Sequence, residues 1–318
     1  MNKRLISVEY LKAFSMIYIV AFWHLLDYTS FFNPTRYIVL TNITTIVLGI
    51  FVLISGFLLG NSNKSKMKYS SFLRKRFIRI YPLYVIAVII FYIFNVNNYF
   101  VTIKSLFLIS MFIGPAPFTL WFITMIMVFY LVTPLLLSIV GNKLKFWLFI
   151  FFILIFEVIL FILFREIDLR VVFYFPFYCL GLYCSKYEVK TKIINFYLGV
   201  VGLAIGLFLN NIIVDSWTLT QFLKGPMILA SSYIIFYIFL YNEGRFIKLS
   251  IISIISYSAF CMYLFHRPIY SFLINIYFPD EFYFQFLYLL VVCFPIIFIF
   301  SFLIQKIYDY MLIKINWN

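Results

Sequence analysis

Long apolar runs follow one another along the whole chain, and they constrain its fold more than any other feature. Ten of them are visible, at roughly residues 5–26, 37–59, 78–95, 118–140, 146–164, 170–185, 193–209, 225–241, 249–270 and 283–306. Each is continuously apolar over about 17 to 22 residues, as a membrane-crossing helix requires. The strands of a membrane barrel would instead alternate apolar and polar residues over about ten positions.

Composition supports the same interpretation. The 318 residues are 65% hydrophobic and only 11% charged, whereas soluble domains carry about 25% charged residues. The sequence therefore predicts an all-α, polytopic membrane helix bundle with about ten transmembrane helices. We expect a single membrane domain over residues 1–318, embedded in the lipid bilayer of the cytoplasmic membrane.

The distribution of basic residues sets the expected orientation. With both termini in the cytoplasm, most Lys and Arg fall in inner segments, as the positive-inside rule requires. The exceptions on the outer side are Arg36, Lys104, Arg165, Arg170, Lys224 and Arg267. The net charge of +14 is thus explained by membrane topology, and we expect no nucleic-acid partner.

The stretch "VTIKSLFLISMFIG", residues 101–114, is a further apolar segment that we do not count as a span. It is too short to cross comfortably, and "NVNN" and "PAP" on either side break helices. Counting it as a span would move every later loop to the opposite side of the membrane. The excess of Lys and Arg on the inner side would then be lost. We expect an interfacial or re-entrant segment.

The four cysteines lie within apolar runs, at Cys179, Cys184, Cys261 and Cys293. None has the spacing of a metal site. We expect free, buried thiols and no bound metal.

The chain has two histidines, His24 and His266, and both fall near the outer ends of their predicted helices. Histidine exchanges protons near neutral pH, so either could serve as a catalytic base. Asp27 lies three residues after His24 on the same helical face and could orient its imidazole. The alternative is that both histidines are interfacial residues, like Trp and Tyr at headgroup level.

Basic residues also stand at the mouth of the third run, in "SFLRKRFIRIYPLY", residues 71–84. Arg76 and Arg79 are three apart and share a helical face. Guanidinium groups grip phosphates through paired donors, so the pair could bind phosphate, with Lys75 beside it. The alternative is an orientation anchor, although Arg79 already lies inside the apolar run.

Three further features have both a functional and a structural interpretation. Ser55 and Gly56 are small and could let a thin ligand, or a neighbouring helix, approach the backbone. Trp121 could contact substrate or belong to an interfacial aromatic belt. Glu157 is a carboxyl inside a span, which marks it as a candidate substrate-binding residue, although it could simply be protonated.

These stretches together resemble the acyltransferase 3 family of integral membrane acyltransferases. The resemblance runs in order through "SVEYLKAFSMIYIVAFWH" (7–24), "LISGFLL" (53–59), "FLRKRFIRIYPLY" (72–84), "LWFITMIMVFYLVTPLLL" (120–137) and "SYSAFCMYLFHRPIY" (256–270). Some positions depart from the family pattern: Glu9 replaces the usual aspartate, Lys12 a common arginine and Ala13 a common glycine. Thr119 stands where a histidine often precedes Leu-Trp, so no role is carried to residue 119.

The resemblance implies an acyl-CoA donor, with acetyl-CoA expected and succinyl or another short acyl group as an alternative. By the same resemblance, His24 is the catalytic histidine, and Arg76 and Arg79 are the paired arginines that hold the donor phosphates. The pantetheine arm would pass Ser55 and Gly56. His24 would then act as a general base or as a nucleophile, while Asp27 or His266 would orient it or hold the acceptor.

The expected reaction is O-acylation of a glycan or a lipid-linked sugar on the outer face of the membrane. Two alternatives remain open from the sequence. One is a multi-pass exporter of a polysaccharide or lipid-linked sugar, although no inverted repeat is visible. The other is a structural or sensory membrane subunit. The sequence does not indicate an oligomeric state.

Overall fold

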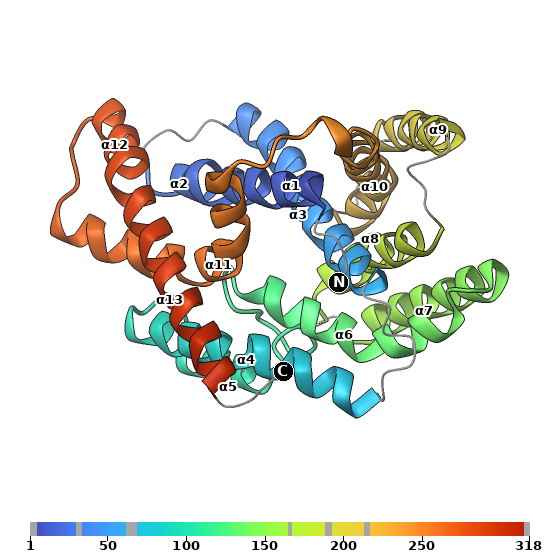
Figure 1. Cartoon of the computed structure of the whole chain (residues 1–318), viewed down its shortest axis with the longest axis horizontal. Coiled ribbons are helices and arrows are strands. Elements are labelled where there is room, and N and C mark those ends of the chain that lie inside the picture. The colour runs from blue at the N-terminus through green and yellow to red at the C-terminus, as the bar shows by residue number, and fades with distance from the viewer. Residues whose placement is uncertain are drawn as a thin grey trace. The chain divides into compact units, whose positions relative to one another are not determined.

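The computed structural model describes residues 5–29, 34–61, 69–164, 167–187, 193–212 and 217–314, without the side chains of 34–38 and 217–218. These residues form helices and connecting turns, with no strand among them (Figure 1). In chain order the helical elements are α1 (Ile6–Tyr18), η1 (Ile19–Trp23), α2 (His24–Leu26), α3 (Pro34–Gly60), α4 (Tyr69–Ile93), α5 (Tyr99–Leu106), α6 (Trp121–Ile139), α7 (Lys143–Leu163), α8 (Leu169–Lys186), α9 (Ile193–Asn210), α10 (Trp217–Tyr241), η3 (Glu243–Arg245), α11 (Ser250–Ile276), α12 (Phe282–Tyr288), η4 (Leu289–Cys293) and α13 (Phe294–Lys314).

Every predicted span coincides with a helix or an unbroken series of helical elements. Within the described residues, eight are long and apolar enough to cross a membrane: Ile6–Leu26, Val39–Gly60, Tyr69–Ile93, Trp121–Ile139, Lys143–Leu163, Ile193–Asn210, Leu219–Tyr241 and Phe282–Lys314. The other two predicted spans correspond to α8 and α11, which contain more polar and tyrosine side chains. The predicted all-helical, multi-pass membrane fold is confirmed.

The segment predicted not to span is a short helix followed by turns. α5 has eight residues, which at 1.5 Å per residue extend about 12 Å, against a hydrocarbon core of about 30 Å. Asn98 caps it by accepting a hydrogen bond from the Val101 amide. Lys104 then donates to the Gly114 carbonyl at 2.7 Å, which ties the following turns back to the helix.

The chain divides into two compact units. The first unit comprises residues Leu48–Tyr241, and the second comprises Leu5–Val47 together with residues from Asn242 onward. The predicted single domain over 1–318 stays a prediction. α3 contributes residues to both units.

In the second unit, α1 packs against α11, which in turn packs against α13. Glu243 connects the two chain segments of this unit, Leu5–Val47 and the segment that starts at Asn242. Its carboxylate accepts hydrogen bonds from the amides of Ile6 and Ser7 at 2.8 and 2.9 Å. It thereby satisfies donors that the first turn of α1 would otherwise leave without partners. Further along, Ser253 donates to Glu9 at 2.7 Å and Lys12 donates to the Ser256 carbonyl at 3.0 Å. These contacts fix α1 against α11.

In the first unit, α9 packs against α10, and α6 packs against α4, α7 and α8. The fully buried Tyr84 connects α4 with α5 and α6. Its hydroxyl lies 2.9 Å from the Thr124 hydroxyl of α6 and 3.2 Å from the Ser105 carbonyl of α5.

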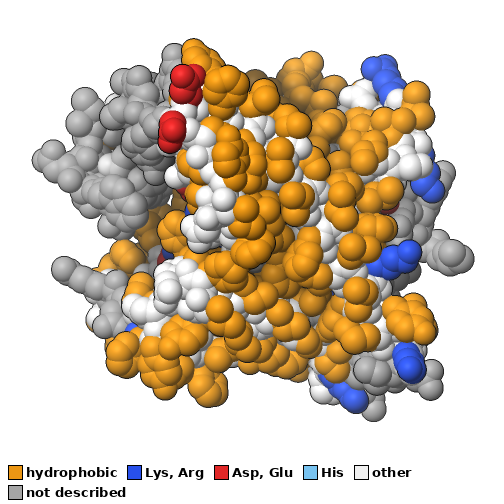
Figure 2. All heavy atoms as spheres, turned by 90° about the vertical axis from the view of Figure 1, so that its left-hand side faces the viewer, with side chains coloured by type: hydrophobic (Ala, Val, Ile, Leu, Met, Phe, Trp, Pro, Cys, Tyr) orange, Lys and Arg blue, Asp and Glu red, His pale blue; other side chains and the backbone are white. Residues whose placement is uncertain are grey.

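The exterior is apolar where a soluble protein would be polar. Hydrophobic side chains cover most of the face drawn in Figure 2. Exposed apolar side chains on α12, η4 and α13 include Phe284, Leu287, Val291, Ile299, Leu303 and Ile307. Such a continuous surface suits lipid, and the helices satisfy their own backbone groups there.

Candidate active site

The first histidine follows an irregular turn of its helix. η1 is a π-helical turn, and the amide of His24 donates to the carbonyl of Ile19, five residues back. π-Turns inside α-helices are rare and frequently mark functional sites. The His24 side chain is 7% exposed.

The two histidines meet ring to ring within the second unit. The imidazoles of His24 and His266 stack with centroids 4.7 Å apart and planes 7° from parallel. His266 lies on α11 and is completely buried. The interpretation of both histidines as separate interfacial residues does not fit this contact.

Hydrogen bonding assigns the proton of His266. Its Nδ1 lies 3.1 Å from the Met262 carbonyl and 2.9 Å from the Tyr263 carbonyl. Because carbonyl oxygens only accept, Nδ1 carries the hydrogen and Nε2 carries the lone pair. Nε2 of His266 and Nδ1 of His24 are buried without a hydrogen-bond partner in the described part of the chain. Buried polar atoms of this kind usually have partners, so these two nitrogens are available to a ligand.

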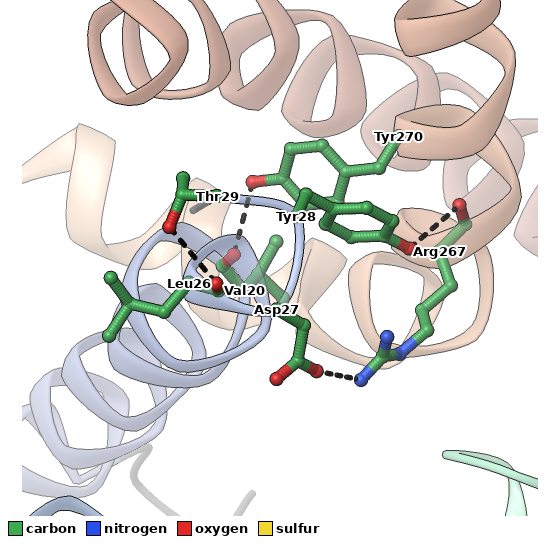
Figure 3. A network of polar contacts seen from close by, with 7 residues as sticks. All are labelled: Val20, Leu26, Asp27, Tyr28, Thr29, Arg267 and Tyr270. Atoms are coloured by element: carbon green, nitrogen blue, oxygen red, sulfur yellow. Dashed lines mark hydrogen bonds and ion pairs between the residues drawn. The ribbon is translucent and has the colours of Figure 1, made fainter. Parts of the chain in front are cut away.

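Asp27 does not orient His24 in the way the sequence predicted. Its Oδ2 accepts a hydrogen bond of 2.5 Å from Nη2 of Arg267 (Figure 3). A guanidinium is a stronger partner for a carboxylate than a neutral imidazole is. The ion pair joins the end of the His24 helix to the residue that follows His266.

Arg267 is the residue of this cluster that sequence reasoning missed. It was counted only as an outer charge, yet it is 6% exposed. Its guanidinium carbon lies 5.8 Å from the centroid of the Tyr28 ring, and the Tyr28 hydroxyl lies 3.5 Å from its carbonyl (Figure 3). Its position directly after His266 was the available signal.

The arginine pair lies on α4 in the first unit. Because α4 begins at Tyr69, Arg76 and Arg79 are both helical and share a face, as predicted. The guanidinium of Arg76 lies 5.8 Å from the centroids of the Phe72 and Tyr130 rings. In the described residues, neither arginine forms an ion pair with a carboxylate. Both guanidinium groups therefore remain available to an anion.

The exposure of these basic residues differs along the helix. Arg76 is half-buried against the aromatic rings, whereas Lys75 and Arg79 are exposed. Arg76 is thus held in position by its aromatic neighbours. The predicted role of these basic residues in donor binding stays a prediction.

The two small residues on α3 have a packing role. A Cβ at Gly56 would lie 2.1 Å from the Tyr178 carbonyl of α8, and one at Gly181 would lie 2.0 Å from the Leu53 carbonyl of α3. Two helix backbones touch here, so protein fills the space beside Gly56 where the family resemblance implies a pantetheine arm. The hydroxyl of Ser55 donates to Phe51 within its own helix at 2.9 Å. The structure favours the packing alternative for Gly56.

Trp121 is 8% exposed at the start of α6. The guanidinium carbon of Arg170 lies 4.0 Å from the centroid of its indole ring, and Arg170 itself is paired with Asp168. Trp121 therefore packs within the first unit and does not form an exposed aromatic belt. Its predicted contact with substrate stays a prediction.

Glu157 lies on α7 with one carboxylate oxygen, Oε2, buried and without a hydrogen-bond partner in the described residues. No cation pairs with it among the residues that the structure describes. Its predicted role in substrate binding stays a prediction.

The four cysteines are free and buried, as predicted. Among the described residues, no three His, Cys, Asp or Glu side chains gather closely enough to hold a metal ion.

Comparison with known proteins identifies the family. The family model described as an acyltransferase domain, acyltransferase 3, matches residues 5–306 of the 318-residue chain. No curated protein and no solved structure matches the chain. The match extends over both units and includes both histidines and both arginines. The chain belongs to the acyltransferase 3 family and is an integral membrane acyltransferase.

Proposed function

We propose that the protein transfers an acyl group, expected to be acetyl, from acyl-CoA to a hydroxyl of an extracytoplasmic glycan or lipid-linked sugar at the cytoplasmic membrane. The observation that carries this proposal is the stacked His24–His266 pair, which brings together two buried imidazoles, each with one nitrogen that has no hydrogen-bond partner among the described residues. Such nitrogens can take a proton from a substrate hydroxyl or accept a hydrogen bond from it.

In the proposed reaction, His24 takes the proton of the acceptor hydroxyl as the oxygen attacks the thioester carbonyl. An O–C bond forms, the C–S bond breaks, and the proton passes to the leaving CoA thiolate. General-base help of this kind contributes typically about 10²–10⁴ in rate. In the alternative nucleophilic route, a nitrogen of neutral His24 attacks the thioester carbonyl, the C–S bond breaks and CoA leaves as the thiolate. The acceptor hydroxyl then attacks the acyl-imidazole, an O–C bond forms as the N–C bond breaks, and the hydroxyl proton passes to the thiolate. Both routes need His24 in its neutral form.

His266 and Asp27 support this chemistry in different ways. Because Nδ1 of His266 is committed to backbone carbonyls, its Nε2 is suited to accept a hydrogen bond from the acceptor hydroxyl. Asp27 holds the guanidinium of Arg267 beside the pair. That guanidinium is suited to stabilise negative charge on the thioester oxygen as the bond forms.

Arg76 and Arg79 are proposed to bind the phosphates of the donor, with Lys75 adding positive charge. The support is their shared helical face, the packing of Arg76 against Phe72 and Tyr130, and the lack of a carboxylate partner among described residues. Guanidinium groups form paired hydrogen bonds with phosphate. The positive-inside orientation would place these basic residues toward the cytoplasm, the side from which the family resemblance implies that acyl-CoA is supplied.

The test uses inside-out membrane vesicles containing the protein and acetyl-CoA labelled on the acetyl group. Label is followed into the polysaccharide fraction and the lipid-linked sugar fraction, with unlabelled succinyl-CoA as a competitor in parallel samples. We expect label in one of the two acceptor fractions, and we expect unlabelled succinyl-CoA to reduce this labelling only weakly. Absence of label from both, with acetyl-CoA failing to bind the purified protein, would contradict the proposal.

A further inference from the structure

In the helix that carries His24, one backbone hydrogen bond is shifted by one residue. In a regular α-helix the amide of His24 would donate to the carbonyl of Val20, four residues back. Here it donates to the carbonyl of Ile19 instead. The carbonyl of Val20 accepts a hydrogen bond of 3.0 Å from the hydroxyl of Tyr270 (Figure 3).

Tyr270 is well placed to stabilise this shifted hydrogen-bond pattern. It lies on α11 one helical turn after His266, and its side chain is completely buried. A buried tyrosine hydroxyl needs an acceptor, and a buried carbonyl that has lost its usual donor needs a new one. Each group therefore satisfies the other, and the contact favours the π-turn over the regular α-helical turn.

The direction of the His24 side chain depends on this turn. A π-turn places one additional residue in the helix, and one residue corresponds to about 100° of rotation at 3.6 residues per turn. Relaxation of η1 to a regular α-helix would thus turn His24 relative to α1. The ring stack with His266, with planes 7° from parallel, requires the observed direction.

We propose that Tyr270 is a positioning residue for His24. Its hydroxyl stabilises the π-turn through the carbonyl of Val20 and so aims the His24 imidazole at its stacking partner and at the substrate. α11 thus contacts both the ring of His24 and the backbone that aims it. The catalytic part of this inference rests on the proposed role of His24.

The experiment compares Tyr270→Phe with a matched control, Tyr288→Phe. Each substitution removes one hydroxyl that donates to a backbone carbonyl. The Tyr270 hydroxyl donates to Val20 at 3.0 Å, and the Tyr288 hydroxyl donates to Leu273 at 3.1 Å. Phenylalanine keeps the aromatic ring, including the contact between the rings of Tyr270 and Tyr28. Loss of ring packing is therefore excluded as a cause of any difference.

The chain has only two histidines, so labelling with ¹⁵N-histidine gives two backbone amide signals and two imidazoles in nuclear magnetic resonance spectra of the purified protein in nanodiscs. His24→Gln and His266→Gln assign them. In Tyr270→Phe we expect the His24 amide and imidazole signals to move, because its amide returns to the Val20 carbonyl. The His266 amide should stay in place and report that the protein is folded. Tyr288→Phe should leave the His24 signals at their wild-type positions.

Kinetics complete the test. We expect Tyr270→Phe to lower kcat by about 10²-fold, as misplacement of a reacting group does, with the KM for acetyl-CoA within about twofold. Unmoved His24 signals, or an unchanged kcat, would overturn the inference. If His24→Gln keeps wild-type transfer, the proposed function fails instead, and the movement of the His24 signals alone then decides whether Tyr270 positions this residue.

Discussion

Asp27 and Arg267 form an ion pair of 2.5 Å between Oδ2 and Nη2, and this pair connects the end of the His24 helix to the residue after His266. The side chain of Arg267 is nearly buried, whereas that of Asp27 is about one-third exposed. A charge-assisted bond in this setting holds both histidine-bearing segments in register. The cluster thus combines an ion pair, a ring stack and a tyrosine–backbone bond within one unit.

Removing the charge of Asp27 should destabilise the protein. We expect Asp27→Asn to cost about 1–2 kcal/mol, which lies toward the lower end for a charged hydrogen bond because Asp27 is partly exposed. The measurement is thermal unfolding in nanodiscs. Arg267→Gln and the variant with both substitutions complete a double-mutant cycle. Asp280→Asn, at an exposed residue of the same unit, is the control and should change stability by less than about 0.5 kcal/mol. Strict additivity of the two single effects would contradict the coupling.

Neutralising Arg79 should weaken donor binding and spare the chemical step. Loss of one exposed phosphate contact predicts a rise of about tenfold in the KM for acetyl-CoA with kcat unchanged. Arg76→Lys should also raise KM, because an ammonium cannot form the paired hydrogen bonds of a guanidinium. Lys145→Ala, at an exposed position on α7, serves as the control. If the arginine variants bind acetyl-CoA with wild-type affinity, donor binding by Arg76 and Arg79 is contradicted and their role is that of an orientation anchor.

The close approach of α3 and α8 predicts a large effect of one methyl group. A Cβ at Gly56 would lie 2.1 Å from the backbone carbonyl of Tyr178, so Gly56→Ala forces the two helices apart at a cost of about 1–3 kcal/mol. Gly141→Ala is the matched control, since nothing lies within 4 Å of a Cβ there. The measurement is the Tm of each purified variant. Equal Tm values for the two variants would show that the helices do not pack this closely.

The helices themselves were predictable from the sequence because the signal for a membrane span is local. A continuous apolar run of sufficient length specifies a helix whatever it packs against, so all ten predicted runs are helical. The same local criteria identified residues 101–114 as too short. α8 and α11 were the less obvious members, since their tyrosines and polar residues face other protein elements and lower their mean hydropathy.

The site was only partly predictable, because its contacts join residues that are distant in sequence. His24 and His266 were both identified, but nothing local in the sequence indicates that their rings stack. Asp27 was assigned to His24 by its spacing, yet a guanidinium on α11 competes for the same carboxylate. The π-turn at η1 and the Tyr270 contact were missed for the same reason, since the acceptor is a backbone carbonyl that no side-chain pattern reveals.

His24 is proposed to perform acyl transfer, while Arg76 and Arg79 are proposed to bind the donor. The most direct measurement is single-turnover transfer from labelled acetyl-CoA in vesicles containing wild type, His24→Ala or His266→Asn, alongside acetyl-CoA binding by each purified protein. We predict that His24→Ala binds acetyl-CoA with a Kd within about threefold of wild type and loses about 10²–10⁴ in transfer rate, and that His266→Asn loses less. Transfer by His24→Ala at the wild-type rate would contradict the assignment of His24 as the catalytic residue.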